Sequence, residues 1–130
     1  MNLKVITPER VVLDTQVDAV YADAEDGQIG ILPGHIPLIS ALKIGVLRYV
    51  SQTKSDAVAV MGGLLKTDGR EVVILSDDAE LGSDIDVARA DIAKRRAEER
   101  LQERAEHVDV NRAQRALARS LARLSAAGRS

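Results

Sequence analysis

Four arginines near the end of the chain recur at helical spacing and are the residues best suited to bind an anion. Arg112, Arg115, Arg119 and Arg123 follow one another at steps of 3, 4 and 4 residues, and no acidic residue occurs between 110 and 130. Like charges at these spacings repel each other on a helix. A row of guanidinium groups without counter-charges therefore predicts either an anion-binding face or, equally well from the residues alone, a solvated basic face.

The other polar residues do not form a recognisable catalytic or metal-binding set. The two histidines, His35 and His107, lie far apart, and no serine or cysteine is placed beside His35 as a nucleophile, which favours a structural role. The acidic pairs 25–26 and 77–78 are sequence neighbours, so on a strand their carboxylates point to opposite faces. We therefore predict no catalytic residue and no metal site.

Composition argues against several functional classes. The chain contains 45% hydrophobic residues but only two aromatic ones, Tyr21 and Tyr49, so its core must be built from Val, Ile, Leu and Ala. Aromatic platforms, on which single-stranded nucleic acids usually stack, are therefore almost absent. There is no cysteine, which fits a reducing compartment. No apolar run approaches the roughly 20 residues of a membrane-spanning helix, so any membrane association is expected to come through a partner.

The first 83 residues read as short β-strands separated by glycine and proline. The stretch 27–38 contains three glycines and two prolines, which predicts a tight corner between two strands. Gly62-Gly63 predicts a bulge or a close backbone approach, and Thr67-Asp68-Gly69-Arg70 predicts a hairpin with a type I′ turn. Turns at this spacing indicate an antiparallel β-sandwich or flattened barrel. Further strands are expected at 3–7, 10–13, 17–23, 36–42, 46–51, 57–61 and 72–75.

From residue 83 the periodicity changes to that of helices. Ser83 or Asp84 can cap a first helix, His107-Val108 is expected to form a turn, and Asp109 or Asn111 can cap a second helix. Each helix has one stripe of small or apolar residues at helical spacing. The stripes are Ala90, Ala93, Ala97, Leu101 and Ala105 in the first helix, and Val110, Ala113, Leu117, Leu121 and Leu124 in the second.

The two helices are expected to form an antiparallel hairpin, and packing their stripes together leaves little apolar surface for the sandwich. We therefore predict two domains, 1–83 and 84–130, with the hairpin held marginally and able to leave the sandwich. The first domain has seven basic and twelve acidic residues, a net charge of −5, and the second has eleven and eight, a net charge of +3. This asymmetry favours an acidic partner for the helical domain.

Several sequence blocks together resemble one known family. They are Gly27-Gln28-Ile29-Gly30-Ile31-Leu32-Pro33-Gly34-His35, Gly45-Val46-Leu47-Arg48, Met61-Gly62-Gly63, Asp77-Asp78-Ala79-Glu80 and Asp84-Ile85-Asp86-Val87-Ala88-Arg89-Ala90. In order and spacing they resemble the epsilon subunit of the F-type rotary ATP synthase, of the bacterial or chloroplast type. Many members have Gly-Gly-Phe where this chain has Gly62-Gly63-Leu64. The resemblance implies a β-sandwich followed by a helical hairpin, in a non-catalytic subunit.

The resemblance also implies a regulatory ATP site on the helical domain. In the family pattern Asp86 could accept a hydrogen bond from the adenine amino group while Arg89 neutralises a phosphate. The alternative is that Asp86 only complements the helix dipole, and that the two form a surface ion pair worth about 0–1 kcal/mol. The implied set is Glu80, Ile85, Asp86, Arg89, Ala90, Arg96, Arg112, Arg119 and Arg123. No cofactor is required, and ATP would act as a regulatory ligand.

The partners that the resemblance implies are other subunits of the synthase. The sandwich would bind the gamma subunit of the central stalk and the membrane c-ring, with Gln28 and His35 as candidate ring contacts. The hairpin would extend to the alpha/beta catalytic head and inhibit ATP hydrolysis. Its candidate contacts are Arg112, Arg115, Arg119 and Arg123. The expected location is peripheral, on the cytoplasmic face of the plasma membrane or the stromal or cytoplasmic face of the thylakoid membrane.

The rival hypothesis is a small binding module whose arginine helix contacts nucleic acid or another acidic partner. A net charge of −2 and the scarcity of aromatic residues argue against nucleic acid. Strongly salt-dependent binding of DNA would support it. The resemblance therefore implies a non-catalytic rotor subunit that couples the catalytic head to the membrane ring, with no nucleic-acid partner and no direct membrane insertion expected.

Overall fold

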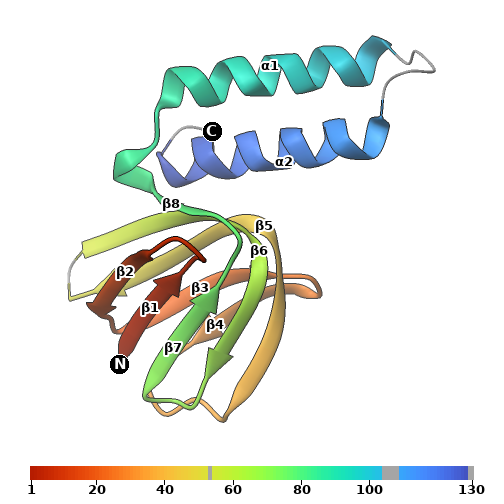
Figure 1. Cartoon of the computed structure of the whole chain (residues 1–130). Helices are drawn as coiled ribbons and strands as arrows, with labels where there is room; N and C mark the ends of the chain where they lie inside the picture. Colours follow the sequence, from red (N-terminus) through yellow and green to blue (C-terminus); the bar gives the residue numbers. More distant parts are fainter. Residues whose placement is uncertain (53, 104–108, 129–130) are drawn as a thin grey trace.

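The computed structural model describes residues 1–130 except 53, 104–108 and 129–130. In this part of the chain, eight strands form one folded sheet and two helices lie beside it (Figure 1). The elements are β1 (Asn2–Ile6), β2 (Val11–Gln16), β3 (Ala19–Ala24), β4 (Gly27–Ile31), β5 (Leu38–Ser51), β6 (Lys54–Thr67), β7 (Glu71–Leu75), β8 (Ala79–Leu81), the 3₁₀ turn η1 (Gly82–Asp84), α1 (Val87–Glu103) and α2 (Val110–Ala126).

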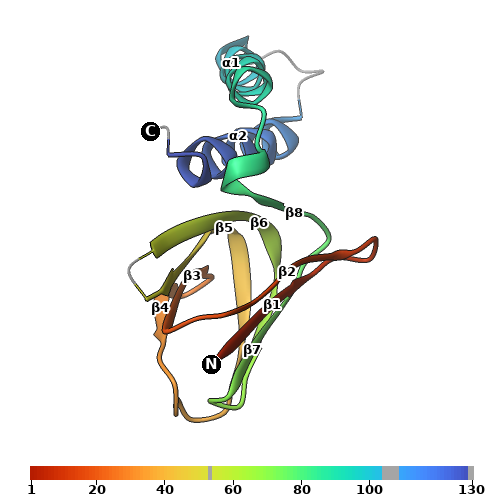
Figure 2. The same cartoon turned by 90° about the vertical axis from the view of Figure 1, so that its left-hand side faces the viewer.

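The sheet folds over itself, so that its two ends face each other across the core (Figure 2). The strand order is β2-β1-β7-β6-β5-β3-β4, and β8 pairs with β6 beyond the end of β7. This confirms the predicted sandwich followed by a helical hairpin. One pairing differs from the antiparallel prediction, because β1 runs parallel to β7. These two strands are far apart in the sequence, so no hairpin connection forces them to be antiparallel.

The core of the sandwich is aliphatic, as composition predicts. Val20, Ala22 and Ala24 of β3 point into it at every second position, whereas Tyr21 is exposed on the other face. Tyr49 is the aromatic residue among the buried hydrophobic side chains of the described part. Burial in this aliphatic surrounding raises the pKa of its hydroxyl, and the nearby carboxylate of Asp56 adds to the effect.

Two strands are much longer than predicted. The sequence indicated separate strands at 36–42 and 46–51, but β5 runs continuously through Gly45 and pairs with the equally long β6 along its whole length. The expected close approach is confirmed at Gly63, where φ is +122° and a side chain would overlap the carbonyl of Leu75. Tertiary pairing therefore overrides the breaking tendency of these glycines.

The hairpin between β6 and β7 is confirmed, but its turn is not of type I′. That turn needs a positive φ at both central residues, and within the described residues only Gly69 of this pair has one, at +90°. The carboxylate of Asp68 explains the difference. Its Oδ1 accepts hydrogen bonds from the backbone N–H groups of Arg70, at 2.9 Å, and Glu71, at 3.0 Å, which stabilises a different turn.

The first helix begins later than predicted, whereas the second is capped by one of the two residues predicted to cap it. Ser83 and Asp84 lie in η1, and α1 starts only at Val87. Asp86 caps α1 instead, because its Oδ1 accepts a hydrogen bond from the backbone N–H of Arg89 at 3.1 Å. Asp109 caps α2 as expected, accepting from the backbone N–H of Arg112 at 3.0 Å. The predicted turn at 107–108 lies outside the described residues.

The predicted stripes are only partly buried. Ala90 and Ala97 of α1 are buried while Ala93 is exposed, and Ala105 lies outside the described residues. In α2, Val110 and Leu121 are exposed, and the buried residues are Ala113, Ser120, Ala122, Leu124 and Ala126. The reason is that α2 lies between α1 and the sandwich and contacts both (Figures 1 and 2), so it buries two faces instead of one stripe.

Candidate functional site: a cavity between sandwich and hairpin

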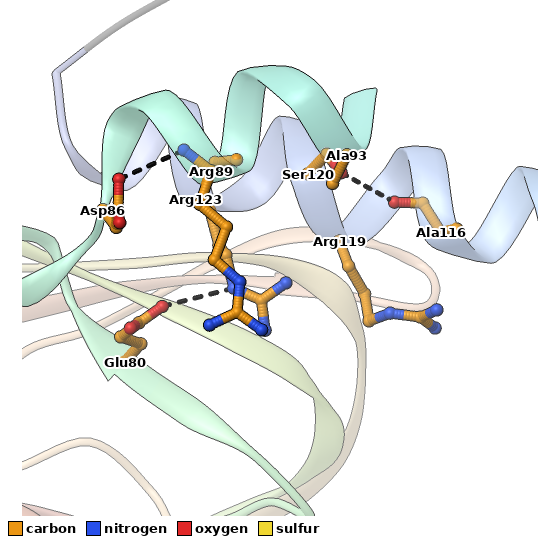
Figure 3. A pocket seen from close by; sticks show the side chains of 9 residues that line it. Glu80, Asp86, Arg89, Ala93, Ala116, Arg119, Ser120 and Arg123 are labelled. Atoms are coloured by element: carbon orange, nitrogen blue, oxygen red, sulfur yellow. Dashed lines mark hydrogen bonds and ion pairs between the residues drawn. The ribbon is translucent and has the colours of Figure 1, made fainter. Parts of the chain in front are cut away.

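A cavity of about 370 Å³ lies where the last strand of the sandwich meets the two helices. It falls within the range of roughly 300–1,000 Å³ that is usual for small-molecule sites. In Figure 3, Glu80, Arg89 and Arg123 come from three separate segments and point toward the same part of the cavity, whereas the guanidinium of Arg119 points away from them. The residues that line it are Glu80, Asp86, Arg89, Ala90, Ala93, Ala116, Arg119, Ser120 and Arg123.

The charged groups are brought together by local structure. Glu80 projects from β8, which is fixed by its pairing with β6. Asp86 and Arg89 lie at the start of α1, where the cap hydrogen bond holds the Asp86 carboxylate in place. Arg119 and Arg123 lie one turn apart on α2. The lining therefore carries three guanidinium groups and two carboxylates, a surplus of positive charge that suits an anion.

Arg123 joins the hairpin to the sandwich. Its Nε donates to Oε1 of Glu80 at 3.2 Å, and its Nη2 lies 3.3 Å from Oδ2 of Asp78. Among the described residues, neither Arg89 nor Arg119 forms an ion pair within 4.0 Å. The cavity thus contains one arginine with carboxylate partners and two that have none in the described part of the chain.

Small residues leave the space between the two helices open. Ala90 and Ala93 of α1 face Ala116 and Ser120 of α2 across the cavity. Ser120 is almost completely buried, and its hydroxyl donates to the carbonyl oxygen of Ala116 at 3.0 Å. The sequence reasoning placed Ala93 only in a helix-packing stripe, and it missed Ala116 and Ser120 as site residues. A signal was present, because both lie on the helix face of Arg119 and Arg123, at spacings of 3 and 4 residues.

Three predicted ATP-site residues do not line the cavity. Ile85 is buried in the small core cluster beneath it. Arg96 and Arg112 are exposed further along α1 and near the start of α2. Arg115, predicted as a partner contact, is also exposed and outside the lining. The structure therefore splits the predicted arginine row, because only its C-terminal half faces the cavity.

The two candidate ring contacts lie elsewhere in the sandwich. Gln28 is exposed in the edge strand β4. His35 lies in the loop that follows β4, where its Nδ1 donates to the carbonyl of Ile36 at 2.6 Å. Neither residue lines the cavity. In the described residues no group of three or more His, Cys, Asp or Glu is arranged to hold a metal ion, and no helix there is long and apolar enough to cross a membrane.

Both halves of the chain match known protein families. Residues 1–82 match the family described as "ATP synthase, Delta/Epsilon chain, beta-sandwich domain". Residues 83–128 match "ATP synthase, Delta/Epsilon chain, long alpha-helix domain". The two matches are consecutive and together extend over almost the whole sequence. The chain therefore belongs to the delta/epsilon chain family of ATP synthases.

Similar proteins narrow the assignment from the delta/epsilon family to the epsilon type. The ATP synthase epsilon chain of Symbiobacterium thermophilum is 48% identical over 129 residues, covering 98% of this chain and 93% of its own. The ATP synthase epsilon chain of Desulforamulus reducens is 45% identical over 126 residues, and the match covers 97% of this chain and 96% of the relative. A chain in the solved Euglena gracilis mitochondrial ATP synthase (OSCP/F1/c-ring) has a TM-score of 0.80 at 25% identity. The match covers 96% of this chain and 79% of that one. This is an epsilon-type chain, a non-catalytic subunit of the complex.

Proposed function

We propose that this chain couples the catalytic head to the membrane ring as a central-stalk subunit, and that its helical hairpin is a movable brake on ATP hydrolysis. The cavity is the observation that carries the proposal. Its lining comes from β8, α1 and α2, so it exists only while the hairpin is docked on the sandwich. A ligand that needs all three segments binds the docked state alone and shifts the equilibrium toward it.

ATP fits the chemistry of the lining. Arg89, Arg119 and Arg123 can neutralise phosphate oxygens, and the carboxylates of Glu80 and Asp86 can accept hydrogen bonds from an amino group of the base. Small side chains between the helices leave room for a flat ring. Arg96 and Arg112 lie further along the same helices, so they would contact only a part of the ligand that extends beyond the cavity. Bound ATP would thus hold the brake in its released, docked position.

The brake requires that the hairpin exchange its present contacts for contacts with the head. Undocking would release Arg123 from Glu80 and Asp78 and add it to the exposed Arg112 and Arg115. A helix with these charges would then face an acidic surface of the alpha/beta head. Basic side chains favour such an encounter over long range, and salt weakens it.

The face of the sandwich that the helices leave bare is the proposed contact with the gamma subunit. Leu64, Leu75 and Ile6 lie opposite one another on neighbouring strands, and Ile6 is paired with Val11 at the sheet edge. Leu64, Leu75 and Val11 are all about half exposed. This row borders an apolar groove of about 430 Å³. Exposed apolar rows of this kind mark protein contacts.

The c-ring contact is proposed for Gln28 and His35, on the basis of the family resemblance. Both the gamma and the ring contact would hold the protein at the membrane through its partners, on the cytoplasmic or stromal face. The nucleic-acid alternative gains no support, because Arg123 already has carboxylate partners and the docked helix does not present four adjacent arginines.

Isothermal titration calorimetry of the full chain with ATP tests whether ATP binds in the cavity. Arg119→Ala should weaken binding about tenfold or more, because it removes a charge-assisted contact. Arg115→Ala is the matched control on the same helix and should leave binding unchanged, because that side chain does not line the cavity. Equal losses in both variants, or no binding by the unmodified chain, would contradict the proposed site.

Hydrolysis of ATP by an epsilon-free catalytic complex tests the brake separately. The full chain should inhibit, and a chain ending at Gly82 should bind the complex without inhibiting. If both versions bind and neither inhibits, the coupling role stands and the brake does not. If neither version binds, the proposed stalk contacts are wrong.

A further inference from the structure

The contact between hairpin and sandwich is concentrated at one end of α2. The residues of α2 that share a buried cluster with the sandwich are Ala122, Leu124 and Ala126, with Ala127 packed against it. At the other end of the helix, residues 110–112 are exposed, and the buried Ala113 is not part of this cluster. The docked hairpin is therefore seated mainly through its last two turns.

Polar contacts are found in the same place. Ser125 accepts a hydrogen bond from Nη2 of Arg48, a residue of β5, at 3.0 Å. Arg123, half a turn away, forms the ion pairs with Glu80 and Asp78. We call residues 123–126 and the sandwich groups that they touch the clasp. It joins the last turn of α2 to β5 and to the segment around β8.

Gly82 lets the helix come this close. It lies directly after β8, and a side chain there would overlap the carbonyl oxygen of Ala126 and would lie 3.1 Å from the carbonyl oxygen of Ala57. Both obstacles are backbone atoms, which cannot rotate away. The segment before Gly82 is fixed by the pairing of β8 with β6. The helix is therefore the part that must move when the glycine is replaced.

We propose that the clasp controls the position of the hairpin and that Gly82 is its essential residue. Any side chain at this position lifts the last turn of α2, and the hairpin then opens from the sandwich. This deepens the proposed movable brake, since it names the contact that must break for the brake to move. It also assigns the control to the end of the chain, far from the exposed arginines at the start of α2.

Distance measurement in the isolated full chain tests the proposal. The chain has no cysteine, so spin labels can be attached to Asp14→Cys in β2 and Gln102→Cys in α1, both at exposed positions. The distance between the labels, measured by pulsed electron paramagnetic resonance, reports the position of the hairpin. Gly82→Ala should raise the ratio of open to docked molecules about tenfold or more, since overpacking against backbone is costly. Gly30→Ala is the control, because its new methyl would meet only the Tyr21 ring, at 3.2 Å.

A single unchanged distance in a folded Gly82→Ala chain would overturn the proposal. If that variant does not fold, the pair Arg48→Gln and Ser125→Ala replaces it, because this change removes the polar contact without adding atoms. It should broaden the distance distribution, whereas Arg112→Gln with Arg115→Gln, at the other end of the helix, should not. No change in the first pair would equally refute the clasp.

The two proposals can fail independently. The distance measurement needs neither ATP nor the other subunits, so its result does not depend on the brake. An open Gly82→Ala hairpin that still fails to inhibit the catalytic complex would retain the clasp and reject the brake. A hairpin that stays docked in every variant would reject the clasp, while inhibition by the full chain would still be tested by truncation.

Discussion

The ion pair between Arg123 and Glu80 should contribute about 1 kcal/mol to docking of the hairpin. The side chains are 28% and 34% exposed, and the 3.2 Å bond from Nε to Oε1 is charge-assisted. Exposed pairs contribute about 0–1 kcal/mol, and hydrogen bonds to charged groups roughly 1.5–3 kcal/mol. Solvent screening places this pair between the two ranges. Asp78 is 62% exposed, so its pair with Arg123 should add only a few tenths of a kcal/mol.

A double-mutant cycle measures this coupling. Arg123→Gln and Glu80→Gln should each speed the exchange of α2 backbone amides, by about fivefold if undocking limits exchange. The double variant should be less destabilised than the sum of the two, leaving an interaction energy of about 1 kcal/mol. The coupling should shrink in about 1 M salt, where the screening length falls to about 3 Å.

The pair of Lys4 and Glu71 provides the control. These side chains are similarly exposed, at 34% and 42%, and lie 3.8 Å apart within the sheet. Lys4→Gln should therefore leave α2 exchange unchanged. Strictly additive effects at Arg123 and Glu80, or a coupling that persists in high salt, would refute the argument that this ion pair holds the hairpin.

Asp86→Ala removes the cap of α1 and should cost about 1 kcal/mol, seen as faster amide exchange in the first turn, while Asp86→Asn should retain most of the protection. Gly63→Ala should lower the melting temperature by about 10 °C, because both its φ of +122° and the overlapping carbonyl oppose a side chain; an unchanged melt would contradict that contact. Asp68 has a pKa lowered by hydrogen bonds from the backbone N–H of Arg70 and then of Glu71. Its carboxylate therefore stabilises the folded state fully above the unfolded pKa near 3.8, and this contribution is lost as pH falls through the lower folded value. The urea midpoint of the unmodified chain should accordingly fall more steeply below about pH 4 than that of Asp68→Asn, and parallel curves would contradict this assignment.

Local patterns were sufficient for the fold class, but not for pairings between distant segments. Alternation and turn residues place most strands, because each strand of the sandwich has one face toward the core and one toward solvent. The length of β5 and β6 could not be read from the sequence, since Gly45 and Gly63 look like ends of strands. Both glycines are held in the sheet by neighbours that come from elsewhere in the chain. The parallel pairing of β1 with β7 is likewise a non-local feature.

The helix start shows why a cap is harder to locate than a helix. Ser83, Asp84 and Asp86 can all accept the first backbone hydrogen bonds, and local sequence does not distinguish them. The structure selects Asp86 because Ile85 is buried beneath the hairpin and has an extended backbone, with φ −73° and ψ 129°. The helix can begin only after that residue is in place.

Sequence reasoning named the charged groups of the cavity and Ala90, but it missed most of the small residues that create the space. The spacing of the arginines marks Arg119, whereas the resemblance to the family points to Glu80, Asp86 and Arg89. The only sequence signal for Ser120 is that it shares the helix face of Arg119 and Arg123, and this does not show whether that face is buried. Its burial depends on how α1 packs across α2, which neither helix specifies by itself.

Arg123 cannot serve its present carboxylates and a phosphate group equally well. A triphosphate in the cavity would attract its guanidinium away from Glu80 and Asp78, so part of the docking energy would be lost on binding. The ligand then favours the docked state only if its contacts to the other segments exceed this loss. The bond from Arg48 to Ser125 and the close packing at Gly82 do not involve the cavity lining. We infer that these contacts keep α2 seated while Arg123 changes partners, so ligand binding and docking remain coupled.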